Sequence, residues 1–407
     1  MEALEQLQFL PPLEAEQIAA RWGTPVFVYD VATLQERARA ALAFRVRFGL
    51  TVRYAMKANP HAEVLRVFQR LGIAIDASSG YEAERALCAG VDGRRILLTA
   101  QELAVDLESL VARGVQFNAC SLHQLETYGR LFPGTEVSVR INPGLGSGHS
   151  HKTNVGGPAS SFGIWHESID EIKAAAARHR LTIKRLHTHI GSGTDPLVWM
   201  RVARLSLDQV RAFPDVTILN LGGGFKVARM RYEKATDLQE VSEVIVAALE
   251  SFATETGRKL HLEVEPGSYL VANAGSLITT VDDIVTTGSD GYKFLKINSG
   301  MNDLLRPTLY AAQHPLVLIN QSLTLEKYVV VGHCCESADL LTPHPDDPEV
   351  VATRTLPQAA IGDLLVVEGV GAYCAAMSAH GYNSFPRTPE LLRHPDGVVE
   401  QVTDAGR

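Results

Sequence analysis

The sequence predicts an α/β protein, a (β/α)8 TIM-like barrel followed by a C-terminal all-β domain. Its 407 residues are too many for one ordinary hydrophobic core, so we expect two domains. Between residues 51 and 265, eight short apolar segments alternate with helical patterns, which is the strand count of such a barrel. After Ala274, apolar segments follow one another with few helical patterns between them, which is typical of an all-β domain.

The first 30 residues are expected to pack with the β domain. Residues 12–22 have the pattern of a short amphipathic helix that Gly23 ends. Residues 26–29 are apolar and aromatic, as in a strand. Asp30 is expected to cap a helix over about residues 32–48.

The barrel, residues 31–275, is predicted from the alternation of strands and helices. The strands are expected at residues 51–56, 73–76, 95–99, 115–118, 136–141, 185–190, 216–221 and 260–265. The helical patterns include residues 62–71, 80–89, 103–113, 168–179 and 241–256. The β domain, residues 276–407, is predicted from strands at residues 276–281, 293–297, 316–319, 328–331 and 363–367.

Composition and charge narrow the class of protein. Apolar residues make up 46% and charged residues 21% of the chain, as in a soluble globular protein. The net charge of -8 is spread along the chain, so neither nucleic acid nor a membrane surface is an expected partner. The acidic N-terminus is unlike a signal peptide, no apolar run reaches the ~20 residues of a membrane span, and the five cysteines show no disulfide spacing. We therefore expect a cytoplasmic enzyme.

Lys57 is the first candidate for a chemical role, because functional groups of such barrels lie at the C-terminal ends of the strands. It follows the first strand, in Tyr-Ala-Met-Lys-Ala-Asn. At the mouth of an apolar strand, desolvation is expected to lower the pKa of a lysine and so supply the neutral amine of a Schiff-base lysine. The alternative is an ordinary solvated lysine at a strand end.

Three consecutive glycines, Gly222, Gly223 and Gly224, follow the seventh strand. Their backbone N–H groups could cradle a phosphate, which in barrels often binds in the loops after the seventh and eighth strands. Ser192 could add a hydroxyl group from the preceding loop. A plain flexible turn is the alternative.

Two histidines, His187 and His189, end the sixth strand two residues apart, so both are expected on one side of it. They could chelate a metal ion, stack on an aromatic cofactor ring or simply fill the barrel mouth. The metal interpretation is weakened because the other strand ends offer no matching cluster of carboxylates and histidines.

Glu265 ends the eighth strand, before Pro266. A carboxylate there could hold a protonated pyridine nitrogen and keep the ring able to withdraw electrons. A salt-bridged glutamate of the barrel wall is the alternative. Taken together, Lys57, the glycine triplet, a stacking histidine and Glu265 predict a site for pyridoxal 5'-phosphate.

Residues 26–383 resemble the fold-type III decarboxylases that use pyridoxal phosphate on an alanine racemase-like barrel, and within them the diaminopimelate branch. The resemblance is carried by Tyr-Ala-Met-Lys-Ala-Asn (54–59), His-Ile-Gly-Ser (189–192), Gly-Gly-Gly (222–224), Glu-Pro-Gly (265–267), Met-Asn-Asp-Leu-Leu-Arg-Pro-Thr-Leu-Tyr (301–310), Cys-Glu-Ser (335–337) and Gly-Ala-Tyr (371–373). Residues 146–163, with Gly-His-Ser at 148–150 and Lys-Thr-Asn at 152–154, also look like the bacterial members of that branch.

The resemblance implies a role for each matching residue. Lys57 would form the Schiff base, His189 would stack on the ring and Glu265 would pair with the ring nitrogen. The other cofactor-binding residues would be Asp76, Ser192, Gly222, Gly223, Gly224, Gly267 and Tyr373. The substrate-binding residues would be Arg306, Tyr310, Glu336 and Tyr373. The planar fork of Arg306 suits a carboxylate, with a surface salt bridge as the alternative, and Glu336 would recognise the distal ammonium of the substrate.

Cys335 would return a proton after CO2 is lost, and a thiol is a suitable general acid. The alternative for Cys334 and Cys335 is a pair of small buried apolar side chains. The resemblance further implies a homodimer with shared active sites, in which Cys335 and Glu336 act in the site of the other subunit. The implied reaction is the decarboxylation of meso-2,6-diaminopimelate to L-lysine and CO2, the last step of lysine biosynthesis.

The chain departs from the family pattern at several positions. Ser268 stands where Glu-Pro-Gly is usually followed by arginine, Ser161 where Ser-Lys-Phe-Gly has lysine, and Ala338 where Cys-Glu-Ser is followed by glycine. The first two changes remove positive charge, which keeps open a related substrate such as ornithine, lysine or carboxynorspermidine. Two hypotheses from different classes of protein also stay open: a metal-dependent barrel hydrolase that uses His187 and His189, and a cofactor-binding protein without catalytic activity.

Overall fold

The chain folds into two compact units. The structure, a computed structural model, describes residues 4–145, 156–189 and 193–402. The barrel unit comprises the described parts of residues 35–226 and 234–270, and the β unit comprises residues 4–34, 227–233 and 271–402. Domain boundaries after residues 30 and 275 stay a prediction.

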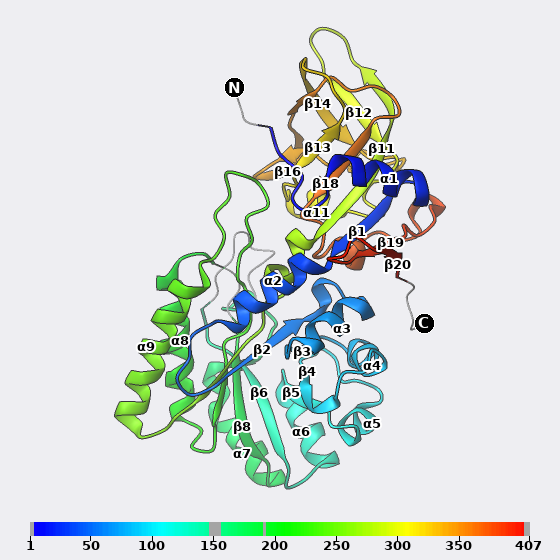
Figure 1. Ribbon diagram of the computed structural model, residues 1–407. Coiled ribbons are helices and arrows are strands. Elements are labelled where there is room, and N and C mark those ends of the chain that lie inside the picture. Colours follow the sequence, from blue (N-terminus) through cyan, green and yellow to red (C-terminus); the bar gives the residue numbers. More distant parts are fainter. Residues whose placement is uncertain (1–3, 146–155, 190–192, 403–407) are drawn as a thin grey trace. The chain divides into compact units, whose positions relative to one another are not determined.

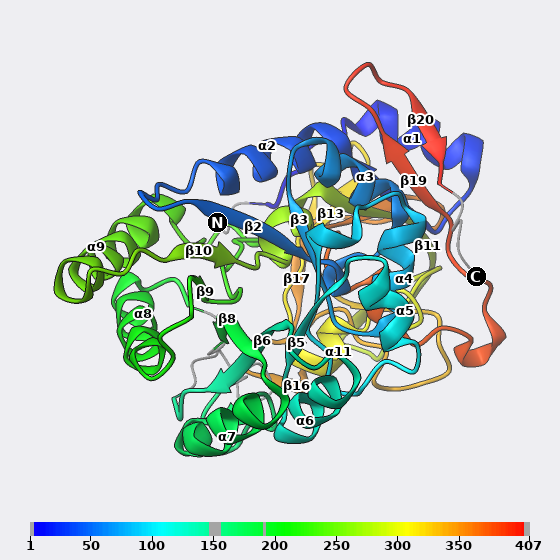
Figure 2. The same cartoon turned by 90° about the horizontal axis from the view of Figure 1, so that it is seen from below.

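Eight parallel strands close the barrel, as the sequence predicts. They are β2 (Leu50–Ala55), β3 (Ala74–Ala77), β4 (Ile96–Leu98), β5 (Gln116–Ala119), β6 (Glu136–Asn142), β8 (Thr182–Thr188), β9 (Ile218–Asn220) and β10 (His261–Val264). Each pairs with the next in this order, and β10 pairs with β2 to complete the ring. Among the described strands, the short strand β7 (Ile164–Trp165) pairs with β6 alone. Figure 2 shows the ring of strands with its helices outside.

The helices of the barrel unit follow the strands in alternation (Figure 1). They are α3 (Ala62–Arg70), α4 (Gly80–Cys88), α5 (Leu107–Ala112), α6 (Leu122–Leu131), α7 (Ile169–His179), α8 (Pro196–Arg211) and α9 (Leu238–Thr256). Helices α6 and α8 continue the predicted alternation in segments for which no helix bounds were given, and α5 is shorter than predicted.

Helix α2 (Val31–Leu42) begins where the sequence predicts but ends six residues early. The Asp30 Oδ2 atom accepts a hydrogen bond from the Thr33 backbone N–H at 2.8 Å, which caps the first turn. Beyond the helix, the Phe44 ring packs edge-on against Phe225, with ring centroids 6.4 Å apart. This tertiary contact outweighs the helix propensity of the residues that follow.

A buried cluster of charged side chains crosses the barrel interior. Glu263 on β10 accepts hydrogen bonds from Arg53 on β2 at 3.0 and 2.8 Å, and its Oε2 atom lies 2.8 Å from Nε of Arg185 on β8. Burial opposes ionisation of Glu263, but the two guanidinium groups outweigh it and lower its pKa to about 2. The cluster therefore links β2, β8 and β10. On β10 the link is at Glu263, two residues before Glu265.

A mixed sheet forms the β unit (Figure 1), and all five strands predicted for this region are present. The strand order is β17 (Arg354–Pro357), β14 (Leu325–Val331), β12 (Lys293–Ile297), β11 (Gly275–Thr286), β1 (Val26–Asp30), β19 (Glu390–Arg393) and β20 (Val399–Gln401). Strand β18 (Leu364–Glu368) pairs with β11 and β13 (Leu316–Ile319), and β15 (Pro343–His344) pairs with β16 (Asp347–Val351).

Helix α1 (Pro12–Trp22), which Gly23 ends as predicted, packs onto this sheet. Its buried Ala15 and Ile18 join Val28 of β1 and Ile278 of β11 in one apolar cluster. Over the described ranges of the chain, no helix combines the length and the apolar composition that crossing a bilayer requires.

Candidate active site

Lys57 lies just beyond the end of β2, in the 3-10 turn that follows the strand. Its side chain is exposed, so the desolvation expected there is not observed. Burial raises the pKa of the nearby Asp76 and Glu265 carboxyl groups, and the Lys57 charge opposes that rise. The amine is therefore within electrostatic reach of both carboxyl groups, although it keeps contact with solvent.

Glu265 is oriented by hydrogen bonds at the end of β10. Asn220 Nδ2 donates to Glu265 Oε1 at 2.6 Å, and Asn220 Oδ1 accepts from the Gly222 backbone N–H at 2.8 Å. The Glu265 residue is 5% exposed, and burial raises its pKa. A buried carboxyl group held in this way can share a proton with a basic ring nitrogen.

His187 and His189 both lie at the end of β8, but they contact different groups. Asn118 Nδ2 donates to His187 Nδ1 at 2.7 Å, which leaves the proton of the neutral imidazole on Nε2, 3.4 Å from Glu265 Oε2. The His189 ring packs on Gly222, where a Cβ atom would lie 2.7 Å from His189 Cγ. Burial lowers the pKa of both histidines well below the usual value, so both are neutral at pH 7.

The contact between His187 and Glu265 is therefore a polar contact and not an ion pair. Its alignment also falls short of a hydrogen bond. Among the residues with a described position, no group of three or more His, Cys, Asp or Glu side chains is arranged to hold a metal ion.

The glycine triplet after β9 adopts a conformation that requires glycine. Gly222 has φ 69° and Gly224 has φ 108°, both in the left-handed region. A Cβ atom on Gly223 would lie 2.2 Å from the Glu265 carbonyl oxygen. Backbone that approaches its neighbours this closely is compatible with an anion cradle of N–H groups.

Sequence reasoning assigned no role to three buried polar residues of the barrel mouth. Arg140 on β6 is 6% exposed, and its guanidinium lies 5.1 Å from the centre of the Phe162 ring. After burial, Arg140 is the next largest cause of the lowered pKa of His187 and His189. Its place at the end of the fifth barrel strand was the available signal. The other two, Asn118 and Asn220, lie within strands and carry no motif.

Four buried polar atoms at the barrel mouth have no hydrogen-bond partner among the described residues. They are Asp76 Oδ1, Asn118 Oδ1, His187 Nε2 and His189 Nδ1. Such orphaned groups are uncommon in folded proteins unless a ligand or water completes them. With the Lys57 amine, the Glu265 carboxyl group and the glycine cradle, they fit a flat heterocycle that carries polar substituents and a phosphate.

Two of the predicted substrate-binding residues, Arg306 and Tyr310, begin and end the one-turn helix α11 (Arg306–Tyr310) of the β unit. Residues four apart lie on the same face of a helix. Thr308 Oγ1 donates to the Ala338 carbonyl oxygen at 2.7 Å, which ties the helix to the loop after Glu336.

Cys335 and Glu336 lie on a loop of the β unit that is fixed through its backbone. The Cys335 N–H donates to Asn383 Oδ1 at 2.7 Å, and the Cys334 N–H donates to Asp339 Oδ2 at 2.8 Å. Cys335 is exposed, whereas burial raises the pKa of Cys334 to about 12. A backbone N–H donated to Glu336 lowers the pKa of that exposed carboxyl group, so it is ionised at pH 7. The two cysteines therefore differ: only Cys335 is accessible to a reactant.

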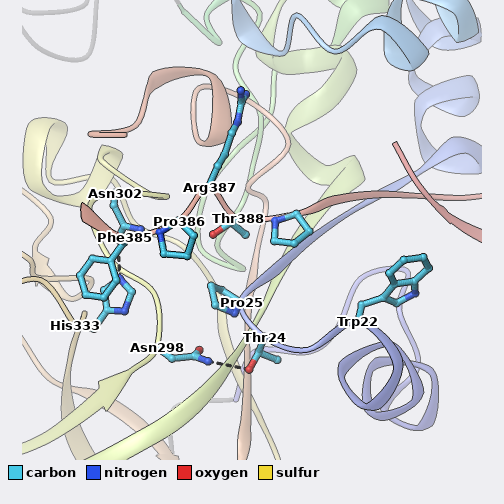
Figure 3. A pocket seen from close by; sticks show the side chains of 11 residues that line it. Trp22, Thr24, Pro25, Asn298, Asn302, His333, Phe385, Pro386, Arg387 and Thr388 are labelled. Carbon is cyan, nitrogen blue, oxygen red and sulfur yellow. Dashed lines mark hydrogen bonds between the residues drawn. The ribbon is translucent and has the colours of Figure 1, made fainter. Parts of the chain in front are cut away.

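A pocket of about 290 Å³ lies beside this loop in the β unit (Figure 3). His333, two residues before Cys335, stacks on Phe385 with ring centroids 3.6 Å apart. Its Nε2 atom lies 2.9 Å from Asn302 Oδ1. The stacked rings of His333 and Phe385 line the pocket and fix the chain immediately before Cys335.

Tyr373 lies in the loop after β18 with a φ of 56°, which is unusual for a tyrosine. The preceding Gly371 N–H donates to the Ala272 carbonyl oxygen at 2.9 Å, and a Cβ atom on Gly371 would lie 1.8 Å from the Val271 carbonyl oxygen. The close approach of two backbone segments thus sets the position of Tyr373. Backbone strain of this kind is concentrated at functional sites.

The predicted site residues fall into three groups. The structure brings together, at the barrel mouth, Lys57, Asp76, His189, Gly222, Gly223, Gly224, Glu265 and Gly267. Those of the β unit are Arg306, Tyr310, Cys335, Glu336 and Tyr373. Ser192 lies outside the described residues, as do residues 148–150 and 152–154. Ser268, one of the departures from the family pattern, is partly buried at the start of α10 (Ser268–Val271).

The closed barrel, with a lysine, a carboxyl group and a glycine cradle at its mouth, defines a class of barrel enzymes that use a pyridoxal cofactor. Residues 31–272 match the family described as pyridoxal-dependent decarboxylase, pyridoxal binding domain. The chain belongs to this family.

Individual relatives show which members of the family the chain is similar to. The chain is 38% identical over 386 residues to the diaminopimelate decarboxylase of Streptomyces coelicolor, covering 92% of this chain and 85% of the relative. A crystal structure of a diaminopimelate decarboxylase superposes with a TM-score of 0.88 at 35% identity, covering 96% of this chain and 94% of the other. The Helicobacter pylori diaminopimelate decarboxylase complexed with L-lysine gives a TM-score of 0.84 at 27% identity, with 96% of each chain covered.

Proposed function

We propose that this protein is a carboxy-lyase that uses pyridoxal 5'-phosphate to convert meso-2,6-diaminopimelate into L-lysine and CO2, at the last step of lysine biosynthesis. The observation that carries the proposal is the barrel mouth, where Lys57 lies within electrostatic reach of the buried, Asn220-bound Glu265. Similarity over nearly the whole chain to diaminopimelate decarboxylases supports the choice of substrate.

The barrel residues would hold the cofactor in this proposal. Lys57 would supply the amine for its covalent attachment, and Glu265 would pair with its ring nitrogen. The neutral His189 would stack on the ring. The backbone of the glycine triplet, with Ser192 and Tyr373, would bind the phosphate, and Asp76 and Gly267 would add further contacts to the cofactor. When bound, the cofactor would supply the electron-withdrawing group for loss of the carboxylate.

The β-unit residues bind the substrate and move a proton. Arg306 and Tyr310 bind a carboxylate from one face of α11, and Tyr373 contributes a further contact. The ionised Glu336 binds the distal ammonium. The exposed Cys335 thiol donates a proton to the carbon from which CO2 has left, since a thiol is a competent general acid near neutral pH.

We further propose that the protein works as a homodimer in the cytoplasm. Each active site uses Lys57 of one subunit with Cys335 and Glu336 of the other, so that neither subunit is active alone. The motifs around these residues support this arrangement.

The test is to incubate purified protein with pyridoxal phosphate and meso-diaminopimelate, and to measure L-lysine and CO2. Equal amounts of both products are expected. Lys57→Ala should form neither, and borohydride should fix the cofactor to Lys57 of the unmodified protein, as peptide mapping would reveal. A cofactor-loaded preparation that forms no L-lysine would overturn the substrate assignment.

A further inference from the structure

Arg229 is a cation of the β unit to which none of the predicted roles applies. It lies in residues 227–233, the segment of the chain that joins the β unit after the glycine triplet. Its Nε atom donates to the Gly369 carbonyl oxygen at 2.8 Å, and a Cβ atom on Gly369 would lie 3.0 Å from Arg229 Cγ. Gly369 has φ 70°, so a side chain there would be strained as well as crowded. The Arg229 side chain therefore packs against Gly369, where a larger residue would not fit.

The segment around Arg229 is itself fixed in place. Asn273 Nδ2 donates to the Ala228 carbonyl oxygen at 2.9 Å, and Glu233 Oε2 accepts from the backbone N–H groups of Arg229 and Met230. The carboxylate of Glu233 is thus engaged with the backbone of the segment that carries Arg229.

Two arginines of this region have buried donors without a partner. Within the described ranges, Arg229 Nη2 and Arg306 Nε are buried and make no hydrogen bond. Desolvation of a guanidinium is costly, and leaving its donors unpaired adds to the cost. Such groups are expected where a ligand completes them.

The positive charge of Arg306 also acts on Arg229. Burial, followed by the positive charge of Arg306, lowers the pKa of Arg229 to about 9. Burial, followed by the charges of these two arginines, lowers the pKa of His314 well below the usual value, so that His314 is neutral. Two like charges brought together in this way favour an anion between or beside them.

We propose that Arg229 and Arg306 together form a receptor for the carboxylate that the substrate keeps after decarboxylation. The inference rests on the proposed function, because it deepens the assignment of the substrate. It also bears on Ser268, where the family pattern has an arginine: Arg229 supplies a second positive charge from another part of the chain. An oxyanion of the same chemistry is present in the phosphate of the cofactor, and the test separates these two sources.

The test compares L-lysine, which has the retained carboxylate, with cadaverine, which lacks it. Dissociation constants of both are measured by calorimetry on the cofactor-loaded protein, in the unmodified form and in Arg229→Gln. We expect Arg229→Gln to weaken L-lysine binding by ~10–100-fold, the effect of losing a charged hydrogen-bond partner. Cadaverine binding and the dissociation constant of pyridoxal phosphate should not change.

Two further variants serve as controls. Arg229→Lys keeps the charge but not the planar fork, so it should recover part of the lost affinity for L-lysine. Arg231→Gln removes an exposed arginine two residues away and should leave all three dissociation constants unchanged. Thermal unfolding of each variant checks that changing the residue packed against Gly369 has not destabilised the protein.

Three results would overturn the inference. They are unchanged L-lysine binding in Arg229→Gln, an equal weakening of L-lysine and cadaverine, and a loss of affinity for pyridoxal phosphate without an effect on L-lysine. The first would remove Arg229 from the site, the second would make its role structural, and the third would assign it to the phosphate. Because binding is measured without turnover, a protein that fails to decarboxylate meso-diaminopimelate but binds L-lysine through Arg229 would overturn only the proposed function.

Discussion

Cys334 and Cys335 are adjacent in the chain, but the first thiol is buried and the second is exposed. Burial raises the pKa of Cys334 to about 12, and its backbone N–H is bonded to Asp339. Cys335 is exposed and anchored through its backbone to Asn383. The structure thus leaves one thiol available for proton transfer and makes the other a packing residue.

Replacing Cys335 by alanine should lower turnover by about 100-fold or more, since a positioned general acid contributes on the order of 10²–10⁴-fold. The absorbance of bound pyridoxal phosphate should be unchanged, because Cys335 is not among the cofactor-binding residues. Cys334→Ala is the matched control and should retain turnover if the loop remains folded. Equal turnover in Cys335→Ala and the unmodified protein would remove the proposed role.

Glu368 makes the stability of the protein dependent on pH. It is fully buried, and burial raises its pKa to about 7, while Ser276 Oγ donates to its Oε2 at 2.7 Å. The folded state therefore keeps a proton that the unfolded chain loses above pH ~4.3. The contribution of this group to stability is fully present below pH ~4.3 and is lost as pH rises to about 7, a change of about 3 kcal/mol.

Glu368→Gln should remove this loss, because the neutral amide keeps an acceptor for Ser276 and does not ionise. In urea unfolding at pH 5, 6, 7 and 8, the variant should gain stability relative to the unmodified protein as pH rises. The exposed Glu349→Gln should show no such trend. Parallel stability curves for Glu368→Gln and the unmodified protein would contradict the raised pKa.

The sequence indicates the residues that carry motifs but not their partners. Lys57 and Glu265 were identified because each follows an apolar strand and lies in a short recognisable segment. Asn118, Arg140 and Asn220 were not assigned, since their roles depend on which strands become neighbours in the closed barrel. No role was assigned to Arg229 either, because its contact with Gly369 joins residues of the β unit that lie 140 positions apart.

At the scale of the elements, the barrel depends on interactions between strands that local patterns do not reveal. Glu263 joins β10 to β2 and β8 through Arg53 and Arg185. The strand pattern itself was predictable, because apolar runs and helical patterns alternate. The end of α2 was not, because it depends on the packing of Phe44 against Phe225.

Glu263→Gln should destabilise the barrel by about 3–5 kcal/mol, because it leaves two buried guanidinium groups without a counter-charge. Since the pKa of Glu263 is about 2, its contribution is present above the unfolded pKa of ~4.3 and is lost as pH falls toward 2. Chemical denaturation at pH 7 measures the change. Glu255→Gln, which breaks an exposed pair with Arg211, is the control and should leave stability unchanged. Similar stabilities for the two variants would show that the buried cluster does not support the strands.

At the scale of the whole molecule, the proposed homodimer can be tested by complementation. Lys57→Ala and Cys335→Ala subunits should each be inactive or nearly so. If each site takes Lys57 from one subunit and Cys335 from the other, a mixture refolded at equal concentrations should recover about a quarter of full activity, through heterodimers that contain one intact site. Two copies of the same variant, refolded together, are the control. No recovery in the mixture, with dimers present by sedimentation, would mean that both residues act within one subunit.

The most direct measurement of the proposed function is the ratio of kcat/KM for meso-diaminopimelate to that for L-lysine, with ornithine as a further substrate. L-lysine has one carboxylate, and in its decarboxylation that group is the one lost. Arg306 and Arg229 would then have no second carboxylate to bind. We predict a strong preference for meso-diaminopimelate, of about 100-fold or more, since unpaired buried charges reject a substrate that lacks their partner. Equal values for the three substrates, or a preference for L-lysine or ornithine, would contradict the assignment of this chain as a diaminopimelate decarboxylase.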